Sequence, residues 1–294
     1  MPGIVSTVDR RQNAACQPTV IAQHMPSPEQ IGRARDGARL VYTLHGAPDA
    51  ANRIVLVHSL AMDRSFWRPL AERLAGSAAV LTYDCRGHGH SDKPSGSQTV
   101  EVHADDLADL MDQLGWPAAL VAGASMGGCI ALAFAIRHPA RARALGLIDT
   151  TAWYGADAPK NWEQRANAAL NSGLSSLIDF QLTRWFGEKF REENPQVVRD
   201  SVDVFLRNDV EAYAQTCRML GACDLRAGLP TIKVPTAIVV GEEDYATPPA
   251  MAEAMHKAIA GSTLTVLRGA RHLTPLERPA EIATALDGLC ARSA

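Results

Sequence analysis

The sequence predicts an α/β protein in which helices flank a mostly parallel central sheet and a helical cap is inserted between two strands. Three observations support this prediction. Short apolar runs rich in β-branched residues alternate with longer stretches of helical spacing, which is typical of sheets built from strand–helix–strand units. The apolar runs are nearly continuous, as in parallel strands covered on both faces. One long interval, 150–234, contains only helix-compatible sequence.

The patterned region opens with a predicted hairpin, because Asp36-Gly37 separates two short extended runs that start at Ile31 and Arg39. Asp-Gly favours a tight turn between strands. Six further strands are expected at 53–58, 79–84, 118–123, 144–149, 235–241 and 264–267. The helices between them are expected at 65–74, 102–114, 126–137, 249–259 and 279–289. Strands and helices in this order predict right-handed crossovers.

The interval without strands is too long to be a simple loop. Helices are expected within it at 162–170, 174–185 and 195–207. We interpret residues 151–234 as a cap or lid over the C-terminal edge of the sheet, where open α/β folds bind their ligands. The α/β core then comprises residues 31–150 and 235–294, and residues 1–30 are expected to be a flexible N-terminal extension. Met25 is a candidate translation start, which an intact mass that includes Met1 or Pro2 would exclude.

Composition narrows the class of protein further. The 294 residues suit one large domain with an insertion, and 29 Lys plus Arg against 32 Asp plus Glu leave no basic surplus to bind nucleic acid. No apolar segment reaches the length of a membrane span, and the first residues contain no signal-peptide core. The six cysteines are scattered, without metal-ligand spacing. We therefore expect a cytoplasmic protein with free thiols, no metal and no organic cofactor, and a homo-oligomer stays possible.

The motif GASMGG at 123–128 is the strongest chemical signal, because it follows an apolar strand and opens a helix. A serine on such a tight strand-to-helix turn needs small neighbours, since larger side chains would collide there. The turn exposes the hydroxyl of Ser125 at a helix N-terminus, where the backbone N–H of Met126 can face an anion. Ser125 is therefore the candidate nucleophile.

A serine nucleophile needs a base and an acid, which this type of turn places later in the chain in the order Ser, acid, His. His272 follows the last strand and is the candidate base, whereas His58 and His88 precede Ser125. Asp244 follows the preceding strand and is the preferred acid. Asp149 ends an earlier strand and is the rival acid.

A second backbone donor for a developing oxyanion is expected from the loop that begins at His58. The N–H of Leu60 is the preferred donor beside that of Met126, and Ser59 is the alternative. The glycine-rich segment 86–92, RGHGHSD, lacks both the P-loop and the dinucleotide-binding patterns. It is expected to be a tight loop braced by ionic and hydrogen-bonding side chains.

Over nearly all of residues 31–292 the chain resembles the α/β-hydrolase superfamily, and within it the 3-oxoadipate enol-lactonases. The resemblance rests on the segments HSL at 58–60, RGHGHSD at 86–92, GASMGG at 123–128, GEEDYATP at 241–248 and GARHLTPLERP at 269–279, and on Trp185-Phe186 and 224–226 (DLR) in the cap. It implies an α/β-hydrolase fold and a catalytic triad of Ser125, Asp244 and His272. His58 and Ala124 stand where the enol-lactonases tend to have Asn and Leu.

The resemblance implies a serine hydrolase that cleaves an ester or lactone of a small, carboxylate-bearing substrate. Trp162 and Arg165, one helical turn apart, are expected to supply a wall and a charge for such a carboxylate. Trp185 is expected either to line the same pocket or to pack in the core of the cap. A carboxylesterase, a C–C bond hydrolase of ring-fission products and a non-catalytic ligand-binding protein on the same scaffold are the alternatives.

Overall fold

The computed structural model describes residues 28–94 and 96–292, which contain one eight-stranded sheet in the order β1-β2-β4-β3-β5-β6-β7-β8. Strands β3 to β8 are mutually parallel, while β2 pairs antiparallel with β1 and β4. The strands are β1 Gln30–Arg33, β2 Arg39–His45, β3 Arg53–Val57, β4 Ala79–Tyr83, β5 Ala119–Ala124, β6 Ala142–Ile148, β7 Thr236–Gly241 and β8 Thr263–Leu267. The mostly parallel sheet and the opening hairpin are as predicted.

The predicted N-terminal extension lies outside the described residues except at its end. Residues 28–30 are described, and Gln30 already belongs to β1. The candidate start at Met25 lies outside the described residues as well.

The prediction that every parallel strand is covered on both faces is wrong for β8. This strand pairs only with β7 and forms an edge of the sheet. Its side chains are mostly exposed, and Val266 keeps 44% of its surface in contact with solvent. The apolar run at this position reflects the β-propensity of its residues rather than burial.

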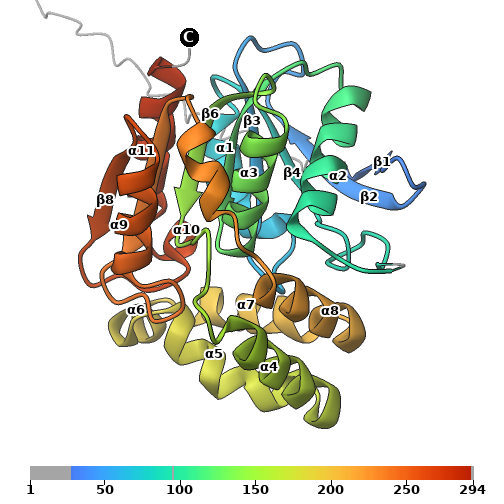
Figure 1. Ribbon diagram of the computed structural model, residues 1–294, viewed down its shortest axis with the longest axis vertical. Helices are drawn as coiled ribbons and strands as arrows, with labels where there is room; N and C mark the ends of the chain where they lie inside the picture. Colours follow the sequence, from blue (N-terminus) through green and yellow to red (C-terminus); the bar gives the residue numbers. More distant parts are fainter. Residues whose placement is uncertain (1–27, 95, 293–294) are drawn as a thin grey trace, which may run out of the picture.

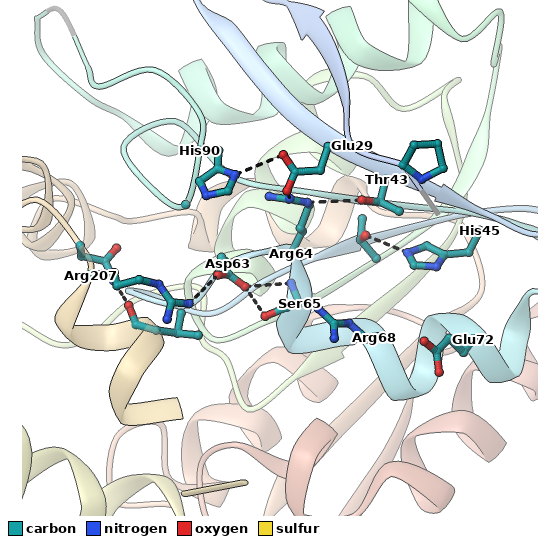
Figure 2. Close-up of a pocket in the computed structure, with 15 residues that line it drawn as sticks. Glu29, Thr43, His45, Asp63, Arg64, Ser65, Arg68, Glu72, His90 and Arg207 are labelled. Atoms are coloured by element: carbon teal, nitrogen blue, oxygen red, sulfur yellow. Dashed lines mark hydrogen bonds and ion pairs between the residues drawn. The ribbon is translucent and has the colours of Figure 1, made fainter. Parts of the chain in front are cut away.

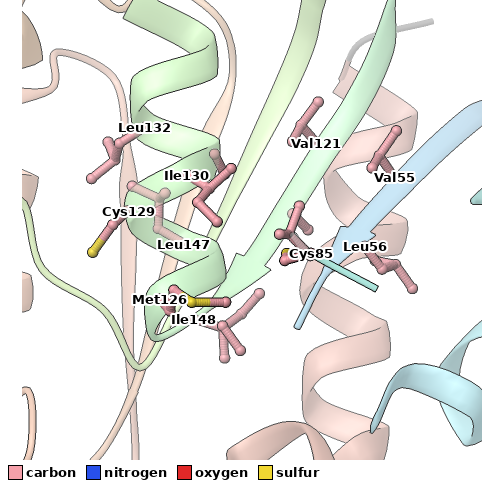
Figure 3. Packing of buried hydrophobic residues seen from close by; sticks show 14 of the residues in the cluster. Val55, Leu56, Cys85, Val121, Met126, Cys129, Ile130, Leu132, Leu147 and Ile148 are labelled. Carbon is pink, nitrogen blue, oxygen red and sulfur yellow. The ribbon is translucent and has the colours of Figure 1, made fainter. Parts of the chain in front are cut away.

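Helices cover both faces of the sheet (Figure 1). Helices α2 and α3 pack together, as do α1 and α11. Almost every residue of α3 is buried, and Figure 3 shows Ile130 of this helix on the side that faces the strands, in the same buried cluster as Val121 and Leu147. The flanking helices are α1 Arg68–Leu74, α2 Val100–Gln113, α3 Met126–Arg137, α9 Pro249–Ala258, α10 Thr274–Glu277 and α11 Pro279–Arg292. No helix in the described part of the chain has the length and apolar character needed to cross a membrane.

Residues 151–234, between β6 and β7, are here called the cap. All of them are described, and they form helices and no strand. Figure 1 shows these helices gathered at one end of the sheet. They are α4 Ala158–Ser172, a 3-10 helix at Leu174–Leu177, α5 Ile178–Trp185, α6 Glu188–Glu193, α7 Pro195–Leu206, α8 Val210–Gly221 and a second 3-10 helix at Arg226–Thr231. The segment expected as one helix over 174–185 is therefore divided, and α6 and α8 were not predicted.

Helix α8 carries a local signal that would have identified it. Asp209 caps its N-terminus by accepting a hydrogen bond from the backbone N–H of Ala212 at 2.9 Å. Glu211 in the first turn adds a favourable charge at the positive end of the helix dipole. The helix packs closely against α4, so these two helices form the centre of the cap.

The loop at 86–92 is braced by buried charges. Arg86 is only 3% exposed and donates to both carboxylate oxygens of Asp106, at 3.0 and 2.6 Å. It also donates to Asp36 in the turn of the hairpin. Burial of the Arg86 and Asp106 charges is tolerated because the two side chains have opposite charges and hydrogen-bond to each other. The loop is thereby attached to α2 and to the β1–β2 turn.

Replacing Arg86 with alanine leaves the buried carboxylate of Asp106 without its partner. We expect Arg86→Ala to lower the free energy of unfolding by about 3–5 kcal/mol, as when one member of a buried ion pair is removed. Urea denaturation with an unchanged m-value is the measurement. Arg218→Ala, which breaks the exposed pair with Glu163, is the control and should cost no more than about 1 kcal/mol. Equal losses in the two variants would contradict the assignment.

Candidate active site

Ser125 stands between the end of β5 and the start of α3 in a strained conformation. Its φ angle is 53°, in the left-handed region that side chains rarely adopt. The neighbouring glycines allow the tight turn: a Cβ atom at Gly127 would lie 2.1 Å from the carbonyl oxygen of Val57, and one at Gly123 would lie 2.0 Å from that of Gly127. Only glycine fits at these two positions, which explains the spacing of the motif.

Two hydrogen bonds connect Ser125 to a buried histidine and a buried aspartate. The Nε2 atom of His272 lies 2.9 Å from Ser125 Oγ, and its Nδ1 atom lies 2.8 Å from Asp244 Oδ2. The three side chains are almost fully buried, with Ser125 and His272 each 6% exposed and Asp244 2% exposed. The structure thus brings together the three residues that the motifs singled out, in the connectivity of a nucleophile, a base and an acid.

Asp244 is held as an acceptor of several hydrogen bonds. Its Oδ1 accepts from the backbone N–H groups of Ala246 and Thr247 at 2.7 and 2.9 Å, and Oδ2 accepts from Thr247 Oγ1 at 2.9 Å. Burial on its own would raise the pKa of Asp244, but His272 and these hydrogen bonds outweigh it, so the pKa lies below its ordinary value. An ionised carboxylate is therefore available to orient the imidazole.

The rival acid does not contact the histidine. The carboxyl of Asp149 is bonded instead to the backbone N–H of Gly241 at 3.1 Å, and to the N–H and hydroxyl of Thr274 at 2.9 and 2.6 Å. Of the two candidate acids, Asp244 and not Asp149 forms a hydrogen bond with His272.

The competing histidines have other partners. His58 Nε2 accepts from the backbone N–H of Cys85 at 2.9 Å, so its Nδ1 carries the proton and donates to the carbonyl of Ser59 at 2.8 Å. Burial lowers the pKa of His58, which keeps the ring neutral. The Nδ1 atom of His88 lies 3.1 Å from the carbonyl of Arg86. Both rings support the loops around them, and neither has a hydrogen bond to Ser125.

The two expected oxyanion donors come from two different segments next to Ser125. Met126 is the first residue of α3, so its N–H belongs to the positive end of a helix. Leu60 and its alternative Ser59 both line the cavity that contains Ser125. The turn after them is tight, because Met62 N–H donates to the carbonyl of Ser59 at 3.1 Å and Ala61 has a φ of 59°. Both residues therefore belong to the loop from which the second donor is expected.

A cavity of about 60 Å³ lies between Ser125 and the cap, and the three cap residues that the sequence singled out, Trp162, Arg165 and Trp185, all line it. A larger cavity of about 560 Å³ shares several of these residues and reaches towards Phe180 and Met251. The small chamber thus adjoins the larger cavity, and both are lined by Tyr154, Trp162, Arg165, Arg184 and Ala246.

Two arginines line both cavities and form no ion pair with a carboxylate among the described residues. Arg165 stacks against the ring of Trp162, with 4.9 Å from its Cζ to the ring centroid, and donates to Tyr213 Oη at 2.6 Å. Arg184 lies over Phe180 at 4.4 Å and donates to the carbonyl of Tyr245. Burial and the like charge of Arg165 lower the pKa of Arg184. Aromatic faces and neutral oxygens therefore hold both cations, and neither is in direct contact with a carboxylate of the described chain.

Sequence reasoning missed Arg184 and Gln181. Gln181 is 2% exposed and lines the chamber that contains Ser125, so its amide can meet a ligand there. Both residues belong to α5, and the period of that helix, with Trp185 already chosen, would have placed Gln181 on the same face four residues earlier.

A further cavity lies elsewhere and differs in character. Figure 2 shows it between the hairpin region, α1 and the end of α7, with about 760 Å³ of space. Two of its three arginines are paired with carboxylates: Arg64 bonds with Glu29, and Arg207 lies 3.6 Å from Asp63. None of the residues of the Ser125 chamber lines it. In the described chain, no cluster of His, Cys, Asp or Glu side chains is arranged to hold a metal ion.

Comparisons with known proteins agree with this architecture. The chain is 32% identical over 254 residues to 3-oxoadipate enol-lactonase 1 of Acinetobacter baylyi, with 86% of this chain and 94% of the relative covered. The crystal structure of an enol-lactonase from Burkholderia xenovorans superimposes with a TM-score of 0.85 at 36% identity, covering 89% of this chain and all of that one. A thermophilic esterase from Thermogutta terrifontis, solved with malate bound, has a TM-score of 0.84 at 28% identity, with 91% and 99% covered.

A family model described as the alpha/beta hydrolase fold matches residues 52–279. This span runs from the start of β3 almost to α11 and includes Ser125, Asp244 and His272. The strand order, the helical cap and the relatives all agree with that match. The chain therefore belongs to the α/β-hydrolase family and is an enzyme that hydrolyses esters or lactones.

Proposed function

We propose that the protein is a serine hydrolase of a small ester or lactone that bears a carboxylate, with a 3-oxoadipate enol-lactone as the model substrate. The observation that carries this proposal is the hydrogen-bonded chain from Ser125 through His272 to Asp244, beside a chamber bordered by two unpaired arginines. The three hydrogen-bonded side chains carry out the reaction, and the two arginines favour an acidic substrate.

In the proposed reaction Ser125 Oγ attacks the substrate carbonyl carbon while His272 Nε2 takes its proton, and Asp244 holds the imidazole in the required tautomer. The N–H groups of Leu60 and Met126 stabilise the negative charge that develops on the carbonyl oxygen. The bond from carbon to the ring or leaving oxygen then breaks, and that oxygen receives the proton from His272. Water, deprotonated by the same histidine, attacks the acyl-enzyme and releases the acid together with Ser125.

The cap is proposed to bind the non-reacting carboxylate of the substrate. Arg165 and Arg184 offer planar, permanently charged donors that match a carboxylate, and Trp162 offers an apolar wall. The amide of Gln181 can add a hydrogen bond to the same substrate. A carboxylate in this place would neutralise the repulsion between the two guanidiniums, so binding of an acidic substrate gains more than binding of a neutral one.

The relatives support this proposal by their chemistry. The enol-lactonases are named for the cleavage of a lactone, and the Thermogutta esterase was crystallised with malate, a dicarboxylic acid. That esterase makes a linear carboxylic ester the second candidate substrate, with the same residues in the same roles. We also place the protein in the cytoplasm, because its five described cysteines are free thiols, as expected in a reducing compartment.

Turnover of an acidic lactone is the direct test. We expect 3-oxoadipate enol-lactone to be hydrolysed with a kcat/KM at least about 10-fold above that of a neutral lactone or ester of similar size, because one charge-assisted contact contributes about 1.5–3 kcal/mol. Ser125→Ala is the control and should abolish both activities. Faster hydrolysis of the neutral esters would remove the acidic lactone from the proposal and leave a carboxylesterase.

Removing either cation should weaken the binding of the acidic substrate. We expect Arg165→Met and Arg184→Met each to raise the KM for the acidic lactone by about 10-fold or more, with a much smaller effect on a neutral ester. Arg218→Met, on an exposed cap arginine paired with Glu163, is the matched control. An unchanged KM in both variants would eliminate the role of the two arginines.

A further inference from the structure

The residue after β6 occupies a strained and fully buried position. Asp149 has no solvent exposure and a φ of 46°, and only Ala61 and Ser125 share a positive φ among the other non-glycine residues described. Such a conformation costs about 1–3 kcal/mol and persists where surrounding contacts enforce it. The contacts of its carboxyl are therefore informative.

Those contacts join the two loops that carry the acid and the base. Oδ1 accepts from the N–H of Gly241, which ends β7 three residues before Asp244. Oδ2 accepts from the N–H of Thr274, two residues after His272, and lies 2.6 Å from the hydroxyl of Thr274. One carboxyl group thus fixes the acid loop and the histidine loop to the same point at the end of β6.

The next residue makes the third connection. Thr150 Oγ1 donates to the carbonyl of Ser125 at 2.7 Å, and the Thr150 side chain packs where a Cβ atom at Gly128 would collide with it at 2.5 Å. Because α3 starts at Met126, this contact fixes the turn on which the nucleophile stands. Two consecutive side chains therefore reach all three loops.

We propose that Asp149 and Thr150 act together as a positioning element that sets the geometry of Ser125, His272 and Asp244. Neither residue has a hydrogen bond with a reacting atom, so both are positioning rather than catalytic residues. This inference rests on the proposed function, because it assumes that the three residues perform the reaction.

The chemistry of the carboxyl explains why an acid occupies this site. Two backbone N–H groups approach different oxygens of Asp149, and asparagine has only one acceptor oxygen, so it would leave one buried N–H unpaired. Burial and the nearby Asp244 raise the pKa of Asp149 well above its ordinary value. Its role is thus the acceptance of hydrogen bonds at the junction of the loops, separate from the ionised carboxylate that faces His272.

The variants Asp149→Asn and Thr150→Val test this proposal. We expect kcat to fall by about 100-fold and about 10-fold respectively with little change in KM, since small displacements of reacting groups have effects of this size. The downfield proton resonance of the His272 Nδ1–H, which reports its hydrogen bond to Asp244, should shift or broaden in Asp149→Asn. Substrate-binding residues are untouched, so a constant KM is part of the expectation.

Matched variants separate positioning from packing. Thr150→Ser keeps the hydroxyl and should restore most of the kcat that Thr150→Val loses. Thr151 is equally buried, but its hydroxyl contacts only Trp153 of its own loop, so Thr151→Val should stay within about twofold of the wild type. If Asp149→Asn does not fold, Thr274→Val removes only the hydroxyl partner of the same carboxyl and is expected to lower kcat with an unchanged KM.

Three results would overturn the inference: folded variants with the kcat and the histidine resonance of the wild type, a rise in KM at constant kcat, or an equal loss in Thr151→Val. The proposed function is judged separately through Ser125→Ala. If wild-type turnover does not depend on Ser125, the proposed function fails. If it does and Asp149→Asn retains full kcat, only the positioning role fails.

Discussion

The hydrogen bond between Ser125 and His272 joins residues 147 positions apart in the sequence. These residues can meet only because the strands before them are parallel, and the rest of the site depends on that arrangement. Strands β5, β6 and β7 are parallel neighbours, so their carboxyl ends reach one edge of the sheet. Ser125 follows β5, Asp149 follows β6 and the Asp244 loop follows β7, while the loop after β8 brings His272 back across β7. A parallel sheet thus converts positions remote in sequence into one buried cluster.

Bringing these loops together requires strained backbone angles and buried charged groups. Packing in the surrounding core offsets this unfavourable free energy. The three non-glycine residues with positive φ in the described chain, Ala61, Ser125 and Asp149, all lie at this edge. Two carboxyl groups are buried near one another, and their environments move the pKa of Asp244 down and that of Asp149 up. A stiff core, in which α3 packs on β5 and β6, can maintain such strain because its side chains have little freedom to relax (Figure 3).

The sequence was sufficient for the parts of this site whose signals are local. A serine in a glycine-flanked turn, or an aspartate and a histidine just after strands, can be recognised from neighbouring residues alone, so Ser125, Asp244 and His272 were found. Arg184 and Gln181 were missed because their role depends on which face of α5 packs over the sheet, and that is set by contacts between remote segments. The proposed positioning role of Asp149 was missed for the same reason, since its hydrogen-bond partners lie 92 and 125 residues away in the sequence. The exposed edge strand β8 shows the converse error, where β-propensity without burial resembled a core strand.

Covalent labelling of the nucleophile tests the central claim most directly. We propose that the buried hydrogen bonds from Ser125 through His272 to Asp244 make Ser125 the reactive hydroxyl of the enzyme. Treatment with a fluorophosphonate followed by intact-mass analysis and peptide mapping should give a single adduct, located on Ser125, and the adduct should form far more slowly in His272→Ala. An adduct on another residue, no adduct at all, or equal labelling in the histidine variant would contradict the account.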